Sequence, residues 1–253
     1  MFSIPAVDLV LYAIWCFAVA LAGGLVGLVL GNLRLPATLV VSSSAAAGTG
    51  ANLVASAVAA ATASIAHIRA RRVDWRLFAW MAPPSVVGGL IGGYVSGVLP
   101  KRVLLAVISV VLFHAAYELF VRPPAPAADE SGRVARGAAV VTGAVVGFVG
   151  GVVGLILGSL RMPAMLRYMR VPARRAAATN VTVGFCVGVA GAIGHLPSAA
   201  PDWTVAAVGA VASIPGALLG SRLTGRLSEP QLMRAIAWIL LVVAVSTAVQ
   251  AVA

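Results

Sequence analysis

A seventeen-residue stretch that occurs twice limits most strongly what this chain can fold into. The first copy, residues 23–39, reads GGLVGLVLGNLRLPATL, and the second copy, residues 150–166, reads GGVVGLILGSLRMPAML. Twelve of the seventeen positions are identical at a constant offset of 127. Each copy predicts an apolar helix that is interrupted near a glycine, an arginine and a proline and is followed by a short second segment. The chain therefore carries one broken helix in two copies.

The composition places this repeat in a membrane protein. The chain is 61% hydrophobic and only 10% charged, with a mean hydropathy of +1.03, whereas soluble domains carry about 25% charged residues. The charges fall between apolar runs of roughly 20 residues, the length at which a helix crosses a bilayer. The alternating pattern of a membrane barrel is absent. We expect an all-α polytopic membrane protein, in which the net charge of +11 reflects loop arginines that set topology and not nucleic-acid binding.

The apolar runs predict two homologous transmembrane repeats. Residues 1–121 form the first repeat, 122–136 a linker rich in proline and alanine, and 137–253 the second repeat. We expect about eight full transmembrane helices and two short or re-entrant segments, 36–48 and 163–178. The full helices are expected at 7–31, 49–68, 77–99, 103–121, 137–158, 179–196, 203–227 and 231–250.

Matches beyond the opening motif extend the repeat. At an offset of 128, His67, Asp74, Ser85 and Gly88 find identical partners in the second half, and Thr49 aligns with Thr179 after a two-residue insertion. The charges then suggest how the halves are related. The loop 69–76 holds four arginines, but its partner 197–202 holds none.

Matching loops of opposite charge lie on opposite membrane faces under the positive-inside rule. This favours an inverted repeat with five passes in each half and both termini outside. The alternative is a parallel repeat with four passes in each half and re-entrant short segments.

Arg34 and Arg161 are the leading candidates for a binding site, because each follows a glycine and precedes a Leu-Pro or Met-Pro step. An arginine in the middle of a bilayer faces protein, water or a partner and not lipid. Two guanidinium groups would bind a sulfonate, sulfite or carboxylate through paired oxygens. In the alternative interpretation the helix ends there and the arginine reaches the lipid headgroups.

Helix starts near these arginines predict further anion contacts. Pro36 and Pro163 favour the first turn of the short segments, and Thr49 and Thr179 are expected to open the next helices. Free N–H groups and the helix dipole at such starts attract anions. The alternative role of the polar residues is hydrogen bonding between closely packed helices. The full set of candidate substrate-binding residues is Arg34, Arg161, Gly31, Gly158, Asn32, Ser159, Pro36, Pro163, Ser43, Thr49, Asn52, Thr179 and Asn180.

Three titratable residues are weaker candidates for proton coupling. His67 and His195 match in the repeat, and Glu118 lies one turn after His114. Proton relay is one interpretation, and a solvated helix end or a local pair is the other. The chain has no enzyme signature, ATP-binding motif or metal-ligand spacing. We therefore expect no catalytic residues, no metal, no cofactor and transport driven by an ion gradient or a partner chain.

The chain resembles the TauE/SafE family of bacterial sulfite exporters. The resemblance depends on the duplicated glycine-rich helix that ends in proline, the Ala-Ala-Gly-Thr step at 46–49, the loop from His67 to Trp75, and the SVVGGLIGG helix that follows. It implies movement of sulfur-containing anions, such as sulfite or organosulfonates, across the bacterial cytoplasmic membrane. The expected partners are a small anion and the lipid bilayer, and a homodimer is left open.

Three functions remain open at this level. The first is an alternating-access carrier for a small sulfur-containing or organic anion. The second is an anion channel that uses the same arginines as a selectivity ring. The third is a membrane scaffold that transports nothing. Saturable, gradient-driven flux distinguishes the carrier from the channel, and loss of flux on substitution of the two arginines excludes the scaffold.

Overall fold

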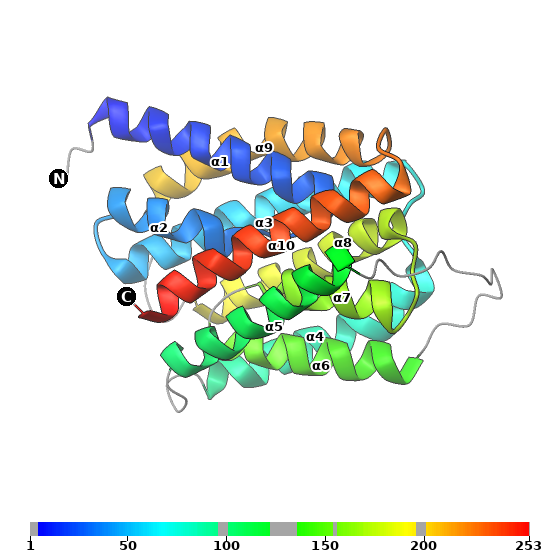
Figure 1. The fold of residues 1–253 in the computed structure, drawn as a ribbon. Coiled ribbons are helices and arrows are strands. Elements are labelled where there is room, and N and C mark those ends of the chain that lie inside the picture. Colours follow the sequence, from blue (N-terminus) through cyan, green and yellow to red (C-terminus); the bar gives the residue numbers. More distant parts are fainter. Residues whose placement is uncertain (1–4, 96–100, 122–135, 154–155, 196–200, 253) are drawn as a thin grey trace.

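The computed structural model describes residues 5–95, 101–121, 136–153, 156–195 and 201–252, and these residues form a helical bundle (Figure 1). The helices are α1 (Ala6–Val26), α2 (Gly31–Val41), α3 (Ala45–Arg69), α4 (Trp75–Tyr94), α5 (Lys101–Val121), α6 (Arg136–Val153), α7 (Gly158–Arg167), α8 (Ala173–His195), α9 (Trp203–Thr224) and α10 (Glu229–Val252).

Six of the described helices, α1, α3, α5, α6, α9 and α10, are long and apolar enough to cross a membrane. Their outward faces carry large apolar side chains, such as Val10, Val110, Val211 and Val249, each more than half exposed. Exposed apolar stripes of this kind are stable against lipid and not against water. The chain is thus a multi-pass helical membrane protein, as expected, and the count of eight full spans stays a prediction.

The two short segments begin earlier than the sequence analysis expected. Helix α1 ends at Val26, and α2 begins at Gly31 and not at Pro36; α7 likewise begins at Gly158 and not at Pro163. The interruption therefore precedes the glycine–arginine–proline motif, and both prolines lie inside the short helices. The fixed φ of proline is compatible with a helix, but each proline removes one N–H donor and crowds the carbonyl four residues earlier.

Helices of the two halves interlock. α1 packs along α9, α4 along α6, α5 along α10, and α3 against both α8 and α9. The two proposed repeats therefore share one core and do not pack as separate bodies. The division into 1–121, 122–136 and 137–253 stays a prediction of the sequence, and most of the linker lies outside the described residues.

Glycine pairs bring these helices into close contact. In α4, Gly88 and Gly92 face α6, where a Cβ at either position would overlap the backbone near Ala144 or Phe148. α9 packs on α1 in the same way through its own glycine pair, 128 residues further along the chain. Small residues at such positions let helix backbones approach closely in lipid. The Gly88–Gly92 face is therefore occupied within the chain, and a homodimer would need another surface.

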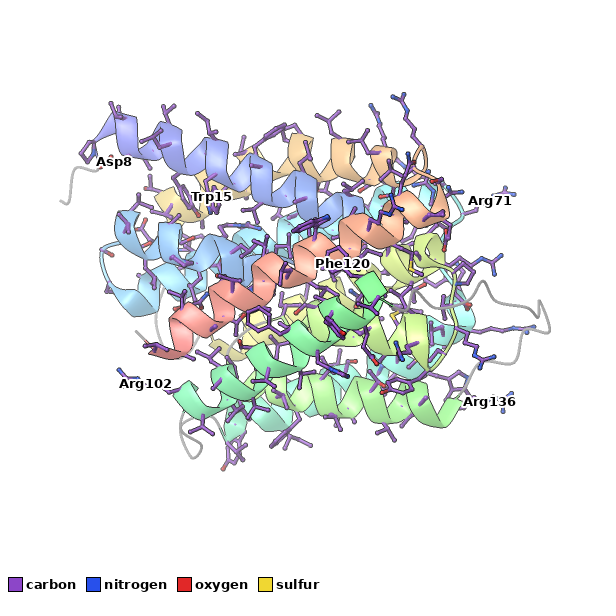
Figure 2. The ribbon with its side chains drawn as sticks, in the orientation of Figure 1. Asp8, Trp15, Arg71, Arg102, Phe120 and Arg136 are labelled. Atoms are coloured by element: carbon purple, nitrogen blue, oxygen red, sulfur yellow. The ribbon has the colours of Figure 1, made fainter. Side chains whose placement is uncertain are left out.

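The chain directions of matching helices differ. Figure 1 shows both ends of the chain at the same end of the bundle. In Figure 2, Asp8 marks the start of α1 at that end, whereas Arg136 marks the start of α6 at the opposite end, where Arg71 also lies. Helices α1 and α6, in whose last turns the two copies of the repeated motif begin, thus enter the bundle from opposite ends.

Candidate functional site

The first break is built on Gly27. This residue has φ 70°, in the left-handed region that favours glycine, and the N–H of Leu28 donates to the carbonyl of Gly23 at 2.9 Å. This is the pattern of a glycine that ends a helix. A Cβ at position 27 would also overlap the backbone of Ala177 in α8. Glycine is therefore required here both for the turn and for the close approach of α8.

The short helices start without side-chain caps. Neither Leu30 before α2 nor Leu157 before α7 supplies a capping hydrogen bond. The first N–H groups of an α-helix have no partner inside the helix. The free backbone N–H groups predicted to attract an anion therefore begin at Gly31 and Gly158. These positions lie five residues before the prolines that were expected to open the short segments.

Pro36 has a different consequence from the one expected. Because proline has no N–H, the carbonyl of Asn32, four residues earlier, has no helical donor. Gln250 in α10 takes that place, and its Nε2 donates to the Asn32 carbonyl at 3.2 Å. The proline therefore couples α2 to the last helix and does not create a helix start.

Arg34 lies inside α2 and is 1% exposed. Its Nη1 donates to Ser213 Oγ in α9 at 3.3 Å. Its Nε is buried and has no hydrogen-bond partner among the described residues. This guanidinium reaches into the bundle and not to the lipid headgroups, so the snorkelling alternative is wrong for Arg34.

Arg161 takes the matching place in α7 and is also 1% exposed. Its Nε donates to Asn180 Oδ1 in α8 at 3.1 Å. Its Nη2 is buried and has no partner among the described residues. The second arginine is therefore buried in the same manner, through a different contact.

Neither guanidinium has a carboxylate partner among the described residues. The ion pairs found there both involve Glu118, with Arg167 at 2.9 Å and His114 at 3.7 Å. Arginine stays charged in proteins, and an uncompensated buried charge is costly. Arg34 and Arg161 thus provide two positive charges and unused N–H donors that an anion would satisfy.

Two asparagines hold the starts of the short helices. Asn52 Nδ2 in α3 donates to the carbonyl of Gly31 at 3.1 Å, and Asn180 Nδ2 in α8 donates to that of Gly158 at 3.0 Å. Asn180 Nδ2 also reaches the carbonyl of Gly27 at 2.9 Å. The matched contacts pair Asn52 with Asn180 at an offset of 128, so aligning Thr49 with Thr179 is wrong by two residues.

The two threonines do not open helices. α3 begins at Ala45 behind Ser44, whose side chain accepts from Ala47 N at 3.2 Å, and α8 begins at Ala173. Thr179 is fully buried, and its hydroxyl accepts from the backbone N–H of Asp74 at 2.9 Å. Thr179 therefore joins α8 to the start of α4, which corresponds to the alternative of interhelical hydrogen bonding.

The remaining polar candidates divide by position. Asn32 and Ser159 are buried at the second residues of α2 and α7, close to the arginines along the chain. Ser43 lies exposed in the link between α2 and α3. Asn32 and Ser159 are therefore placed to contact a ligand bound at the breaks, whereas Ser43 is not.

The candidates for proton coupling are not brought together with the arginines by any contact found here. His67 is completely buried near the end of α3, and neither ring nitrogen has a partner among the described residues. It is not the solvated helix-end residue of the alternative interpretation. Glu118 pairs with Arg167 at the end of α7. The side chain of His195 lies outside the described residues.

A small cavity lies beside the first break. Its lining includes Arg34, Gly23, Leu28, Ala60 and Val181, and its volume is about 10 Å³, room for about one water molecule. An inorganic oxyanion is larger than this space. The described conformation therefore holds the arginine in a closed interior.

Sequence reasoning missed two contributors to this site. Ser213 bonds to Arg34, and Gln250 bonds to the Asn32 carbonyl. Ser213 belongs to a serine pair that matches across the repeat, with Ser85 as its partner. That match was the available signal, but it does not tell which helix faces the arginine.

Comparison with known proteins gives one family and one relative. The sequence model described as "Sulfite exporter TauE/SafE" matches residues 12–247. The "Probable membrane transporter protein YunE" of Bacillus subtilis (strain 168) is 32% identical over 99 residues. That match covers 39% of this chain and 35% of the relative, so only about a third of the relative's length is spanned. No solved structure matches the chain.

Proposed function

The chain belongs to the TauE/SafE sulfite exporter family, and from this premise we propose that it is a secondary-active transporter of small sulfur-containing or organic anions. Sulfite and organosulfonates are the substrates that the family suggests. The relative from Bacillus subtilis is described as a probable membrane transporter, which agrees with transport in general. The proposed location is a bacterial cytoplasmic membrane.

The observation that carries the proposal is the burial of Arg34 and Arg161 without carboxylate partners among the described residues. Each arginine follows a chain break and has one buried guanidinium nitrogen without a hydrogen-bond partner in the part of the chain that the structure describes. A bound anion would compensate the charges and accept these hydrogen bonds. Breaks at matching positions of two halves are also typical of transporter binding sites.

Alternating access is supported by the arrangement of the helices. α1 and α6 start at opposite ends of the bundle (Figure 2), as an inverted repeat requires. The cavity at Arg34 admits about one water molecule, so an anion can enter or leave only after the structure opens. We propose that the bundle opens to one side at a time around the two breaks.

The orientation follows from the loop charges. The end of the bundle marked by Arg71 and Arg136 in Figure 2 lies opposite both chain ends. Arg69, Arg72 and Arg76 flank Arg71 in sequence. Under the positive-inside rule this end faces the cytoplasm and the chain ends face outward.

Flux measurements in proteoliposomes test the proposal. The purified chain should carry sulfite, an organosulfonate or a simple carboxylate in a saturable manner that depends on an ion gradient. Arg34→Gln and Arg161→Gln should each abolish this flux, whereas Arg222→Gln, at an exposed position in α9, should leave it unchanged. Currents that do not saturate would indicate a channel. Unchanged flux in Arg34→Gln and in Arg161→Gln would overturn the proposal.

A further inference from the structure

The two buried arginines are matched in sequence but are held by different partners. Arg34 bonds to a serine in α9, Ser213, and Arg161 bonds to an asparagine in α8, Asn180. If the surroundings of Arg34 and Arg161 had the same arrangement, both arginines would donate to a serine or both would donate to an asparagine. The described conformation is therefore asymmetric at its centre.

The atoms that would make the missing contacts are all present, buried and unused. By the offset of 128, Asn52 is the asparagine that matches the partner of Arg161, and Ser85 is the serine that matches the partner of Arg34. Among the described residues, Asn52 Oδ1 and Arg34 Nε both lack a hydrogen-bond partner, and so do Ser85 Oγ and Arg161 Nη2. Leaving buried polar atoms unpaired is unfavourable, so four such atoms that form two matched pairs need an explanation.

The residues of each unmade pair lie on helices that contact each other or share a neighbour: α2 contacts α3, and α4 and α7 both contact α8. Asn52 already contacts α2 through the Gly31 carbonyl, one turn before Arg34. On the other side, Arg161 Nη2 lies 3.5 Å from the position of a Cβ on Gly184.

From Gly184 the path leads to α4. Val187 follows Gly184 in α8 by about one turn, and its side chain lies 3.8 Å from the position of a Cβ on Gly89. Gly89 in turn follows Ser85 by about one turn of α4. α7 and α4 both contact α8, so Arg161 reaches Ser85 only if α7 moves relative to α4.

We propose that the two arginines exchange partners in opposite directions between two conformations. In the second conformation Arg34 leaves Ser213 and donates from Nε to Asn52 Oδ1, while Arg161 leaves its asparagine and donates from Nη2 to Ser85 Oγ. Ser213 and Ser85 are thus positioning residues, each of which stabilises one of the two conformations. This inference rests on the proposed transport function, in which the two conformations open to opposite sides.

The exchange explains these four unpaired atoms. The four lack partners among the described residues in this conformation and become paired in the other, and the two arginines make the same number of these hydrogen bonds in both. Two conformations of similar free energy are what a carrier needs in order to cycle. A rigid scaffold would instead be expected to pair all of these groups in one structure.

Ser85→Ala and Ser213→Ala test the exchange by hydrogen–deuterium exchange of the full chain in lipid nanodiscs, without added substrate. The measured quantity is the ratio of deuterium uptake in residues 27–41 to that in residues 154–167. Ser213→Ala destabilises the described conformation, and Ser85→Ala destabilises the other. The ratio should therefore shift in opposite directions in the two variants and return toward the wild-type ratio in the double variant.

Ser64→Ala is the matched control. Ser64 is also buried (3% exposed), and its hydroxyl has no hydrogen-bond partner among the described residues. No hydrogen bond found among those residues joins it to either arginine, so the ratio should not change. Ser85→Cys and Ser213→Cys, which keep the side-chain size, repeat the test if an alanine variant does not fold.

A purely structural role of these serines gives a different result. The Ser85 hydroxyl has no hydrogen-bond partner among the described residues, so its removal would then leave the ratio unchanged. An unchanged uptake ratio in Ser85→Ala, or shifts of the ratio in the same direction in Ser85→Ala and Ser213→Ala, would overturn the proposed exchange. Because no flux is measured, opposite shifts without transport in proteoliposomes would instead refute only the proposed function.

Discussion

Asn180 and Gly27 are separated by 153 residues, yet Asn180 Nδ2 donates to the Gly27 carbonyl at 2.9 Å. The same amide nitrogen donates to the Gly158 carbonyl at 3.0 Å, and Asn180 Oδ1 accepts from Arg161. One side chain thus fixes both chain breaks and one of the two buried arginines. Asn180 therefore links the two breaks directly.

Replacing Asn180 by alanine should destabilise the protein more than the same change at Asn52. Asn180→Ala leaves two carbonyls and the Nε of Arg161 without their partner, at a cost of about 1–3 kcal/mol for each buried group. Asn52→Ala removes one donor, to the Gly31 carbonyl, and should cost about 1 kcal/mol. Thermal unfolding of both variants in detergent measures the difference. Equal losses of stability would show that the contact between the two breaks contributes little.

Replacing Gly27 by alanine should be among the most damaging changes to the fold. The left-handed conformation costs a non-glycine residue about 1–2 kcal/mol, and the added Cβ would overlap the backbone of Ala177. We expect a loss of at least about 2 kcal/mol in unfolding free energy. Gly137→Ala is the control, because a Cβ there meets nothing within 4 Å near the start of α6. Gly137→Ala should leave the unfolding free energy unchanged or raise it slightly. An equal loss of unfolding free energy in Gly27→Ala and Gly137→Ala would refute the special requirement for glycine at position 27.

The sequence predicted the class of fold and drew attention to the two arginines that the structure buries. Apolar runs of about 20 residues indicate transmembrane helices regardless of how they pack. The duplicated arginines were identified because a charge inside an apolar run needs a partner. These inferences depend on local sequence alone, and the structure places both arginines in the interior.

The local geometry at the breaks was harder to predict. Pro36 was expected at a helix start, because proline is common there, but the left-handed glycine at 27 ends the preceding helix first. Thr49 was aligned with Thr179 because the residue types match, whereas the carbonyls of Gly31 and Gly158 select Asn52 and Asn180. Such contacts depend on how α3 and α8 pack on the breaks, and periodicity contains no information about that.

Glu118→Gln tests whether this carboxylate couples protons to transport. In the structure Glu118 forms a partly exposed ion pair with Arg167, with 24% and 35% of the side chains exposed. Pairs of this kind contribute about 0–1 kcal/mol. We therefore expect a small change in stability and an unchanged dependence of flux on pH, measured in proteoliposomes across a range of internal and external pH. Loss of the pH dependence with retained flux would identify Glu118 as the coupling group.

Replacing Arg34 by methionine should make the protein more stable and inactive at once. The side chain keeps most of its length, while an uncompensated buried charge is removed, which should raise the unfolding free energy by about 1 kcal/mol or more. Ser213 keeps its bond to the Gly209 carbonyl at 2.6 Å, so no new unpaired group arises there. Anion flux and stabilisation by sulfite should both disappear, because the donor for the anion is gone.

Arg72→Met is the matched control for this change. Arg72 Nη1 donates to the carbonyl of Ser221 near the end of α9 at 2.8 Å, a structural role in which a cation at a helix C-terminus is favourable. Its removal should lower stability by about 1 kcal/mol and leave sulfite-dependent stabilisation intact. Thermal unfolding with and without sulfite compares the two variants. If Arg34→Met destabilises the protein as much as Arg72→Met does, the buried guanidinium stabilises the fold and is not an anion-binding group.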